Sequence, residues 1–399
     1  MENCCDPLPA STHRPGPGPV TGPLTGVRVV ELAGIGPGPF TAMLLADLGA
    51  DVIRVDRRTD PAYGLPSRDV LLRGRRSIAV DLKQPEGLRT VLKLVAGAEV
   101  LIEGFRPGVA ERLGLGPDQC LAAQPALVYG RMTGWGQTGP LSATAGHDIN
   151  YIALTGALDG FRRAGERPTP PMNLLGDLGG GALYLAFGIL AAVLEARASK
   201  RGQVVDANIV DGTASLMNFI LGLRAQGAWN NPPGHNALDT GSPYYDTYTC
   251  ADEREIALGA LEPQFYLRLL ELTGVTEPAV ALANRDDPAY FDAARRCWSA
   301  TFRTRTRDDW AALLGGSDAC AAPVLSIDEA RQHPQLAERG TYLERDGILQ
   351  AAPAPRFSRT TVTLGRPPCS PGQHTNEILA EQGFDRAQID ALREAGVVR

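Results

Sequence analysis

Residues 27–32 (VRVVEL), 40–48 (FTAMLLADL) and 51–56 (DVIRVD) decide the fold. The first and third segments are β-branched runs of strand length, whereas the second places its apolar residues at helical spacing. A strand, a helix and a strand of these lengths predict a βαβ unit with parallel strands.

The same alternation continues along the chain. Strands are expected at 77–81, 99–102, 127–131 and 204–207, and helices at 86–96 and 178–198. Strands that alternate with helices are typical of an open α/β sheet wound on both faces.

The pattern changes after residue 208 and predicts a second, smaller α+β domain. We expect a long helix at 208–229, a Pro/Gly/Asn-rich linker at 230–242, strands at 245–249 and 255–261, and helices at 263–272 and 307–315. From residue 342 the chain is expected to be irregular and Pro-rich until two short terminal helices. We expect Asp385 to be the N-cap of the last helix and Gly396 to end it.

Composition limits the class of partner. The chain has 399 residues and 45 acidic against 39 basic side chains, a net charge of −6 that argues against nucleic-acid or anionic-membrane surfaces. Its seven scattered cysteines predict neither a disulfide framework nor a metal site, and they favour a reducing, cytoplasmic location. The longest apolar run, 182–194, is shorter than the roughly 20 residues that span a bilayer.

The turn at 34–39 (GIGPGP) lies where a dinucleotide fingerprint would stand. The third glycine of that fingerprint would fall on Pro39, however, and Pro37 and Pro39 lack the N–H groups that a pyrophosphate needs. A rigid turn that leads into a helix is therefore the better interpretation, and no nicotinamide cofactor is expected.

A series of motifs indicates a family. They are 29–40 (VVELAGIGPGPF), 47–57 (DLGADVIRVDR), 71–83 (LLRGRRSIAVDLK), 101–116 (LIEGFRPGVAERLGLG), 131–140 (RMTGWGQTGP), 146–156 (GHDINYIALTG), 173–181 (NLLGDLGGG), 202–214 (GQVVDANIVDGTA) and 371–379 (PGQHTNEIL). In this order they resemble the family III CoA-transferases, and within them the branch that racemises 2-methylacyl-CoA thioesters.

The resemblance implies an α/β fold with a Rossmann-like large domain built from both chain ends, a smaller inserted α+β domain, and a homodimer of interlocked subunits that share the active site. On this chain we expect a flexible tail at 1–23, the large domain at 24–207 and 340–399, a linker helix and loop at 208–242, the small domain at 243–325, and a return linker at 326–339.

Racemising such a thioester requires two acid–base groups that flank C2, and hydrogen-bond donors for the enolate oxygen. Imidazole suits the first role, and the motif places the catalytic base at His147. Asp177 is the second candidate and the expected N-cap of an Ala/Leu-rich helix. We expect its backbone N–H to serve the enolate oxygen and the glycines at 179–181 to admit a bulky ligand.

Two further residues complete the predicted catalytic set. The resemblance points to Glu262, contributed by the partner subunit, as a carboxylate that offsets the effect of the helix terminus on the pKa of Asp177. Asn173 is expected to orient Glu262 or Asp177 by a side-chain hydrogen bond.

Coenzyme A is part of the expected substrate, so neither a separate cofactor nor a metal is expected, and its phosphates require cations. The family match places Arg57 against CoA, and Arg75 and Arg76 lie near it in sequence. Further positions expected to line the CoA site are Val80, Asp81, Leu82, Lys83, Arg112, Gly146, Asp148, Ile149, Asn150 and Tyr151.

An alternative remains within the same family. In the CoA-transferases an aspartate at the Asp177 position acts as a nucleophile and forms an acyl anhydride. That chemistry does not need a histidine at position 147, so His147 favours proton transfer.

Overall fold

The structure is a computed structural model that describes residues 21–58 and 65–399. Most of the predicted tail, together with Cys4 and Cys5, lies outside the described residues. Contacts within the chain divide it into two compact units. The sheet unit comprises Met1–Met132, Leu185–Asp206 and Ala352–Arg399, and the site unit comprises Thr133–Tyr184 and Ala207–Ala351. Residues 133–184 thus group with the second unit and not with the sheet-bearing residues among which the sequence analysis placed them.

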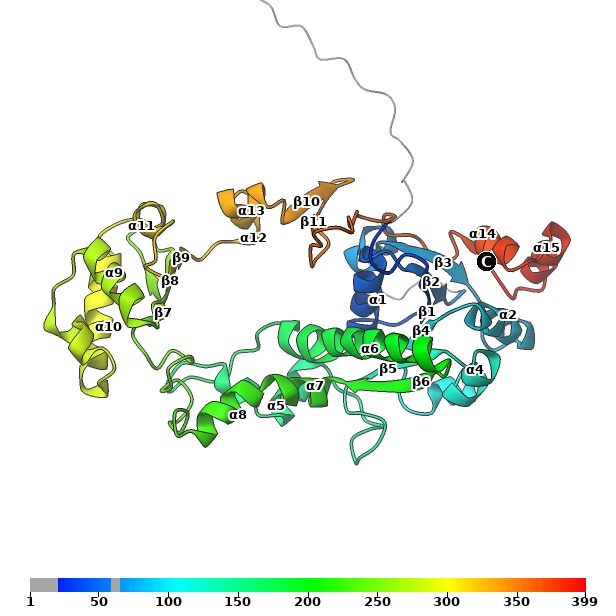
Figure 1. Cartoon of the computed structure of the whole chain (residues 1–399), viewed down its shortest axis with the longest axis horizontal. Coiled ribbons are helices and arrows are strands. Elements are labelled where there is room, and N and C mark those ends of the chain that lie inside the picture. The colour runs from blue at the N-terminus through cyan, green and yellow to red at the C-terminus, as the bar shows by residue number, and fades with distance from the viewer. Residues whose placement is uncertain (1–20, 59–64) are drawn as a thin grey trace, which may run out of the picture. The chain divides into compact units, whose positions relative to one another are not determined.

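The sheet unit contains a six-stranded sheet in the order β3-β2-β1-β4-β5-β6 (Figure 1). Strands β1 to β5 pair in parallel, and β2 occupies its predicted residues. The strand order reverses between β1 and β4, and ligands of open α/β sheets bind beyond the carboxyl ends of the strands near such a reversal. The strands are β1 Arg28–Leu32, β2 Asp51–Asp56, β3 Arg75–Ala79, β4 Val100–Glu103, β5 Val128–Thr133 and β6 Gln203–Asn208.

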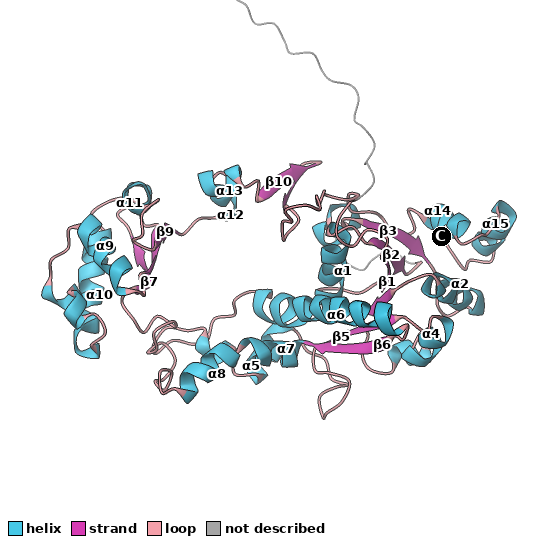
Figure 2. Ribbon diagram, viewed as in Figure 1, coloured by secondary structure: helices cyan, strands magenta, loops and turns pink. Residues whose placement is uncertain are grey.

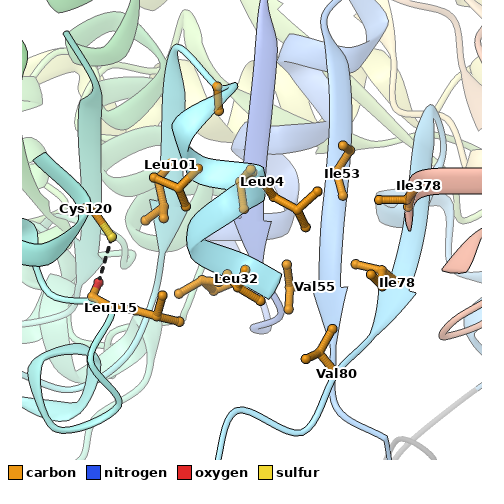
Figure 3. Close-up of a cluster of buried hydrophobic side chains, with 14 of the residues drawn as sticks. Leu32, Ile53, Val55, Ile78, Val80, Leu94, Leu101, Leu115, Cys120 and Ile378 are labelled. Atoms are coloured by element: carbon orange, nitrogen blue, oxygen red, sulfur yellow. Dashed lines mark hydrogen bonds between the residues drawn. The ribbon is translucent and has the colours of Figure 1, made fainter. Parts of the chain in front are cut away.

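Helices lie against this sheet (Figure 2), and its apolar residues are buried. Side chains of the strands meet Leu94 of α2 and Ile378 of α14 in one cluster, in which Cys120 donates a hydrogen bond to the carbonyl of Leu115 (Figure 3). The helices are α1 Pro37–Asp47, α2 Pro85–Ala96, α3 Val109–Arg112, α4 Pro117–Ala123, α6 Tyr184–Ser199, α14 Thr375–Glu381 and α15 Arg386–Glu394, with 3₁₀ turns η1 Pro66–Arg68 and η2 Val70–Leu72. Asp385 caps α15 and Gly396 has a positive φ just after it, as predicted.

Buried charges connect the first three strands. Glu31 of β1 is 1% exposed and accepts hydrogen bonds from Arg54 of β2 at 2.6 Å and from Arg75 of β3 at 2.5 Å. A buried carboxylate is tolerated only where such partners surround it. The three strands therefore hold a register in which these side chains meet.

The site unit contains two groups of elements. The first comprises α5 Asp148–Leu154, the 3₁₀ turn η3 Leu158–Gly160, the π-helix η4 Leu174–Leu183, α7 Ile209–Leu216 and α8 Asn218–Ala225. The second is an antiparallel sheet, β7 Tyr245–Thr249, β8 Glu255–Gly259 and β9 Ala321–Pro323, with helices α9 Pro263–Thr273, α10 Pro288–Phe302 and α11 Arg307–Leu314. Trp298, Phe302 and Trp310 are buried in its core. Connecting elements are η5 Pro278–Val280, η6 Leu282–Asn284, α12 Ile327–Ala330, α13 Pro334–Glu338, β10 Tyr342–Arg345 and β11 Ile348–Ala351.

Three predictions for this unit are wrong. The predicted helix at 208–229 is two helices that meet at Met217 and end by Ala225. Helix α10 was not expected, although Trp298 and Phe302 stand four residues apart and both are fully buried. The segment after residue 342 forms a β-hairpin across Asp346–Gly347, a dipeptide that is itself a strong hairpin signal.

The predicted short apolar segment at 182–194 belongs to a longer helix. Helix η4 continues directly into α6, and the stretch Leu174–Ser199 has 26 residues with a hydropathy of 1.7. By length and composition alone it is the one described helix that could cross a membrane. One face of α6 packs on the sheet (Figure 1). There the side chains of Leu185 and Ile189 occupy the space next to Gly130 of β5 into which a larger side chain would project.

Helices η4 and α7 cross in close backbone contact. A methyl group on Gly212 of α7 would lie 1.8 Å from the carbonyl oxygen of Gly180 in η4. Neither backbone can yield without moving its helix, so the glycines fix how closely η4 and α7 approach.

We therefore expect Gly212→Ala to lower the free energy of unfolding by about 1–3 kcal/mol, the range that overpacking costs. Gly222→Ala is the matched control, because a methyl group on this glycine of α8 meets nothing within 4 Å. It should leave stability unchanged or raise it by roughly 0.5–1 kcal/mol. Guanidinium unfolding followed by tryptophan fluorescence measures both, and equal stability of the two variants would contradict the prediction.

Candidate active site

Helix α5 begins with a turn that is stabilised by hydrogen bonds among its own residues and that carries His147. The side chain of Asn150 accepts a hydrogen bond from the backbone N–H of His147 at 3.0 Å, which closes the turn in the manner of a capping box. Tyr151 is buried, donates its hydroxyl to the carbonyl of Gly146, and packs edge-on against Trp135 at 4.7 Å between ring centroids. These contacts fix the backbone, while the imidazole of His147 lies exposed at the helix N-cap.

Asp148, the next residue, points the other way and joins α5 to η4. Its Oδ2 atom accepts a hydrogen bond of 2.7 Å from the backbone N–H of Asp177. The first N–H groups of any helix lack partners within that helix, so an outside acceptor must satisfy them. Asp148 was expected to line the CoA site, and the structure instead shows its carboxylate holding Asp177.

Two expectations about Asp177 are wrong as a result. Asp177 is not an N-cap, because Asn173 precedes the first residue of the π-helix and Asp177 stands within it. Its N–H is also not free for an enolate oxygen, because Asp148 occupies it. The π-helical winding, with the N–H of Leu178 bonded to the carbonyl of Asn173, could not be read from the sequence.

The glycines around Asp177 accommodate other parts of the chain, and this also differs from expectation. A methyl group on Gly180 would lie 2.5 Å from the hydroxyl of Thr213 in α7. A methyl group on Gly176 would lie 2.4 Å from Oδ2 of Asp148. The space expected for a ligand at Gly180 is therefore filled by α7, and Gly176 is required where the Asp148 carboxylate approaches.

The surroundings of Asp177 raise the pKa of its carboxyl group. Burial is the largest cause, and the negative charge of Asp148 adds to it. The side-chain amide of Asn173, which donates to Oδ2 of Asp177 at 3.3 Å, and the nearby His147 act in the opposite direction. The structure thus brings His147, Asp177 and Asn173 together, and the carboxylate that favours a protonated Asp177 is Asp148.

Helix α5 offers the hydrogen-bond donors that Asp177 does not. Among the described residues, no acceptor takes the backbone N–H of Asp148 or of Ile149. Both groups stand in the first turn of the helix, directly after His147, where the helix dipole favours negative charge. The sequence motif contained these residues, but only the helix start shows which of their atoms are available.

Glu262 lies elsewhere in the site unit. It is exposed and is the N-cap of α9, in the group that contains the small sheet. No contact between Glu262 and His147 or Asp177 occurs within the described chain.

The remaining predicted CoA residues lie in the sheet unit. Arg57 is exposed immediately after β2, and Arg112 is exposed at the end of α3. Asp81 accepts the N–H of Lys83 at 3.0 Å, a bond that lowers the pKa of its carboxyl group, and Val80 is buried in a bridge to Val398. Arg57 and the segment Val80–Lys83, with Leu82, follow the carboxyl ends of the neighbouring strands β2 and β3.

Arg75 and Arg76 do not fit a phosphate site, which corrects the expectation from their position in sequence. Arg75 is fully buried against Glu31, and Arg76 is bound by Asp51, Glu377 and Glu381. In the part of the chain that the structure describes, no three His, Cys, Asp or Glu side chains cluster as metal ligands.

Comparisons with known proteins identify the family of the chain. The model of CoA-transferase family III matches residues 24–375, and the chain belongs to this family. It is similar to α-methylacyl-CoA racemase of Mus musculus, at 43% identity over 94% of this chain and 97% of the relative, and to that of Homo sapiens, at 41% identity over the same shares. The human succinyl-CoA:glutarate CoA-transferase is 28% identical over 94% of this chain and 90% of its own.

A solved structure has the same fold. It is a CaiB/BaiF family protein from Brucella suis, with a TM-score of 0.77 and 27% identity, and the match covers 91% of this chain and all of that chain. The mixed α/β architecture with a parallel six-stranded sheet is that of this family.

The hydrogen bond from Asn173 makes a testable prediction. In Asn173→Ala the carboxylate of Asp177 loses a donor that stabilises its charged form, so its pKa rises further and the group stays protonated to a higher pH. Carbon-13 NMR of labelled aspartate carboxyls, with the signal assigned by Asp177→Asn, measures the shift. Asn218→Ala removes an exposed amide of α8 and should leave the titration unchanged. An unshifted or lowered titration in Asn173→Ala would contradict the geometry described.

Proposed function

We propose that this chain is an α-methylacyl-CoA racemase, an isomerase that interconverts the (2R) and (2S) forms of 2-methylacyl-CoA thioesters. The observation that supports this most is that His147, at the start of α5, lies close enough to Asp177 of η4 for its charge to act on that carboxyl group, while Asp148 next to it binds the backbone of Asp177. An imidazole and a carboxyl group of raised pKa are two acid–base groups of the kind that a 1,1-proton transfer needs.

The reaction removes a proton from C2 and returns one to the opposite face. One of the pair takes the proton as the C–H electron pair moves into the thioester to form an enolate. The other then gives its own proton to C2 from the far side, and the electrons return to carbon. Reaction in the reverse direction exchanges the two roles, so both groups must hold and release a proton.

The enolate oxygen carries the negative charge of the intermediate. The free N–H groups of Asp148 and Ile149 at the start of α5 are the donors for it, in place of the occupied N–H of Asp177. One preorganised donor of this kind is typically worth about 3–4 kcal/mol in the transition state. No step in this scheme uses a metal or a cofactor, because coenzyme A is part of the substrate.

The CoA moiety has cationic partners in the sheet unit. Arg57 and Lys83 follow adjacent strands of the Rossmann-like sheet, and both are exposed, in contrast to the buried Arg75 and Arg76. Arg57 is therefore the residue assigned to the phosphates of CoA.

A family III CoA-transferase is the second candidate, supported by the relatives that are named CoA-transferases at 27–30% identity. In that reaction Asp177 would attack the thioester carbonyl as a nucleophile. That chemistry needs no second acid–base group, so His147 would have no role in it.

A second copy of the chain completes the proposed site. Phe187 and Leu194 of α6 are 73% and 71% exposed, and apolar side chains this exposed on one helix are typical of an interface. The family resemblance supports an interlocked homodimer in which Glu262 of one subunit serves the His147 and Asp177 of the other.

The proposed reaction predicts exchange of the C2 proton. In deuterated water the wild-type protein should incorporate deuterium at C2 of a 2-methylacyl-CoA and lose the optical rotation of a single enantiomer, with no acceptor acid present. His147→Ala and Asp177→Ala should each lower turnover by at least ~100-fold, because one proton relay is missing. His333→Ala is the control for a histidine outside the site. Transfer of CoA to an added free acid, without exchange, would support the transferase and overturn the racemase.

Sharing of the site between subunits predicts complementation. His147→Ala and Glu262→Ala homodimers should each be impaired, but a mixed dimer contains one site with both wild-type residues. Random co-assembly of equal amounts of the two variants should therefore restore about a quarter of the wild-type sites, as expected for a symmetric dimer. Activity of the co-expressed, size-fractionated protein measures this recovery. No recovery would show that Glu262 does not serve the partner's His147.

A further inference from the structure

The carboxylate of Asp148 has two oxygen atoms in different surroundings. Oδ2 accepts the N–H of Asp177 at 2.7 Å, whereas Oδ1 accepts no hydrogen bond from any described residue, although Asp148 is only 7% exposed. Removing a carboxylate from water without full pairing is unfavourable. A side chain held in this way at the junction of α5 and η4 calls for a functional explanation.

A second observation concerns the neighbouring glycine. The place where Gly176 would carry a methyl group lies 2.4 Å from Oδ2 and 2.9 Å from Cγ of Asp148. The backbone of η4 therefore leaves a space at Gly176 that the Asp148 carboxylate occupies. Gly176 and Asp177 meet the same carboxylate, one by leaving room for it and the other by donating to it.

The contact between Asp148 and Asp177 also bears on His147, because His147 directly precedes Asp148. His147 and Asp148 are consecutive, and the turn they form is fixed by Asn150 and Tyr151. Two consecutive residues therefore act on both groups of the site. His147 carries the imidazole, and the side chain of Asp148 binds the backbone of Asp177, which carries the carboxyl group.

We propose that Asp148 is a positioning residue whose carboxylate sets the place of Asp177 relative to His147 and, through its charge, the proton occupancy of Asp177. The inference rests on the proposed racemase function and deepens it. A hydrogen bond from an N–H to a charged oxygen is about twice as strong as a neutral one, which suits it to hold a reacting group. A misplacement of about 1 Å can lower a rate by about a hundredfold.

Among the described residues, the charges that act on Asp177 come from α5. They are Asp148 and the N-cap residue His147. Helix α7, which also packs on η4, carries Asp211, and the side-chain amide of Asn208 donates to this carboxylate at 2.6 Å. Asp148 is thus the carboxylate whose removal should change the titration of Asp177.

The first experiment uses Asp148→Asn in the full-length protein. The amide keeps the shape of the side chain but removes the charge, so Asp177 should titrate at a lower pH in carboxyl carbon-13 NMR. The turnover number should fall about tenfold with little change in KM, and the pH dependence of turnover should move with the titration. Asp118→Asn removes an exposed charge in the sheet unit and should change none of these.

The second experiment is a double-mutant cycle between positions 148 and 176. Asp148→Ala and Gly176→Ala should each lower turnover by about 10- to 100-fold, because each displaces the contact to Asp177. In the double variant the added methyl group no longer meets the carboxylate, so the combined loss should be close to the larger single loss. The free energy of unfolding, measured on the same four proteins, should show the same lack of additivity.

Three outcomes overturn the inference. The first is an unchanged titration of Asp177 in Asp148→Asn. The second is unchanged turnover in Asp148→Asn and Asp148→Ala. The third is a loss of turnover in the double variant equal to the product of the two single losses. If the wild-type protein shows no exchange at C2, the proposed function fails instead. The NMR titration and the unfolding cycle need no substrate and still decide whether Asp148 governs Asp177.

Discussion

The hydrogen bond from the N–H of Asp177 to the carboxylate of Asp148 is the interaction on which the site depends. It satisfies an N–H that the start of η4 leaves unpaired and gives a donor to a buried charge, and bonds to charged groups are worth about 1.5–3 kcal/mol net. The bond also ties the start of α5, which carries His147, to the backbone of the residue that carries the second carboxyl group.

The sheet could be predicted from the sequence because its signals are local. The β-branched segment 51–56 is a strand at the predicted residues, and α2 begins one residue before its predicted start, at Pro85. Strands β7 and β8 of the small sheet were predicted for the same reason, whereas β9 was not expected. Helix α10 and the hairpin at Asp346–Gly347 carried comparable local signals and were missed, whereas the break at Met217 has no Gly or Pro to mark it.

Partners that are distant in sequence could not be predicted in the same way. Arg75 and Arg76 follow one another beside the expected phosphate site, yet one binds Glu31, 44 residues away, and the other Glu381, 305 residues away. Likewise, the motifs identified His147, Asp148 and Asp177 through the family resemblance. The bond that joins the last two spans 29 residues, and no spacing rule reveals it.

The same bond bears on why a carboxylate and an imidazole can share one reaction. In water their pKa values are about 3.9 and 6.5, so a proton on the imidazole is favoured by about 3.5 kcal/mol. That difference disfavours a protonated carboxyl group, which is the form needed when the carboxyl group acts as the acid. Burial of Asp177 and the charge of Asp148 both raise the pKa of its carboxyl group above that of a carboxyl group in water. A group that must both take and return a proton works best when its pKa lies near the working pH. The fold thus uses one carboxylate to place its neighbour and to adjust how tightly that neighbour holds a proton.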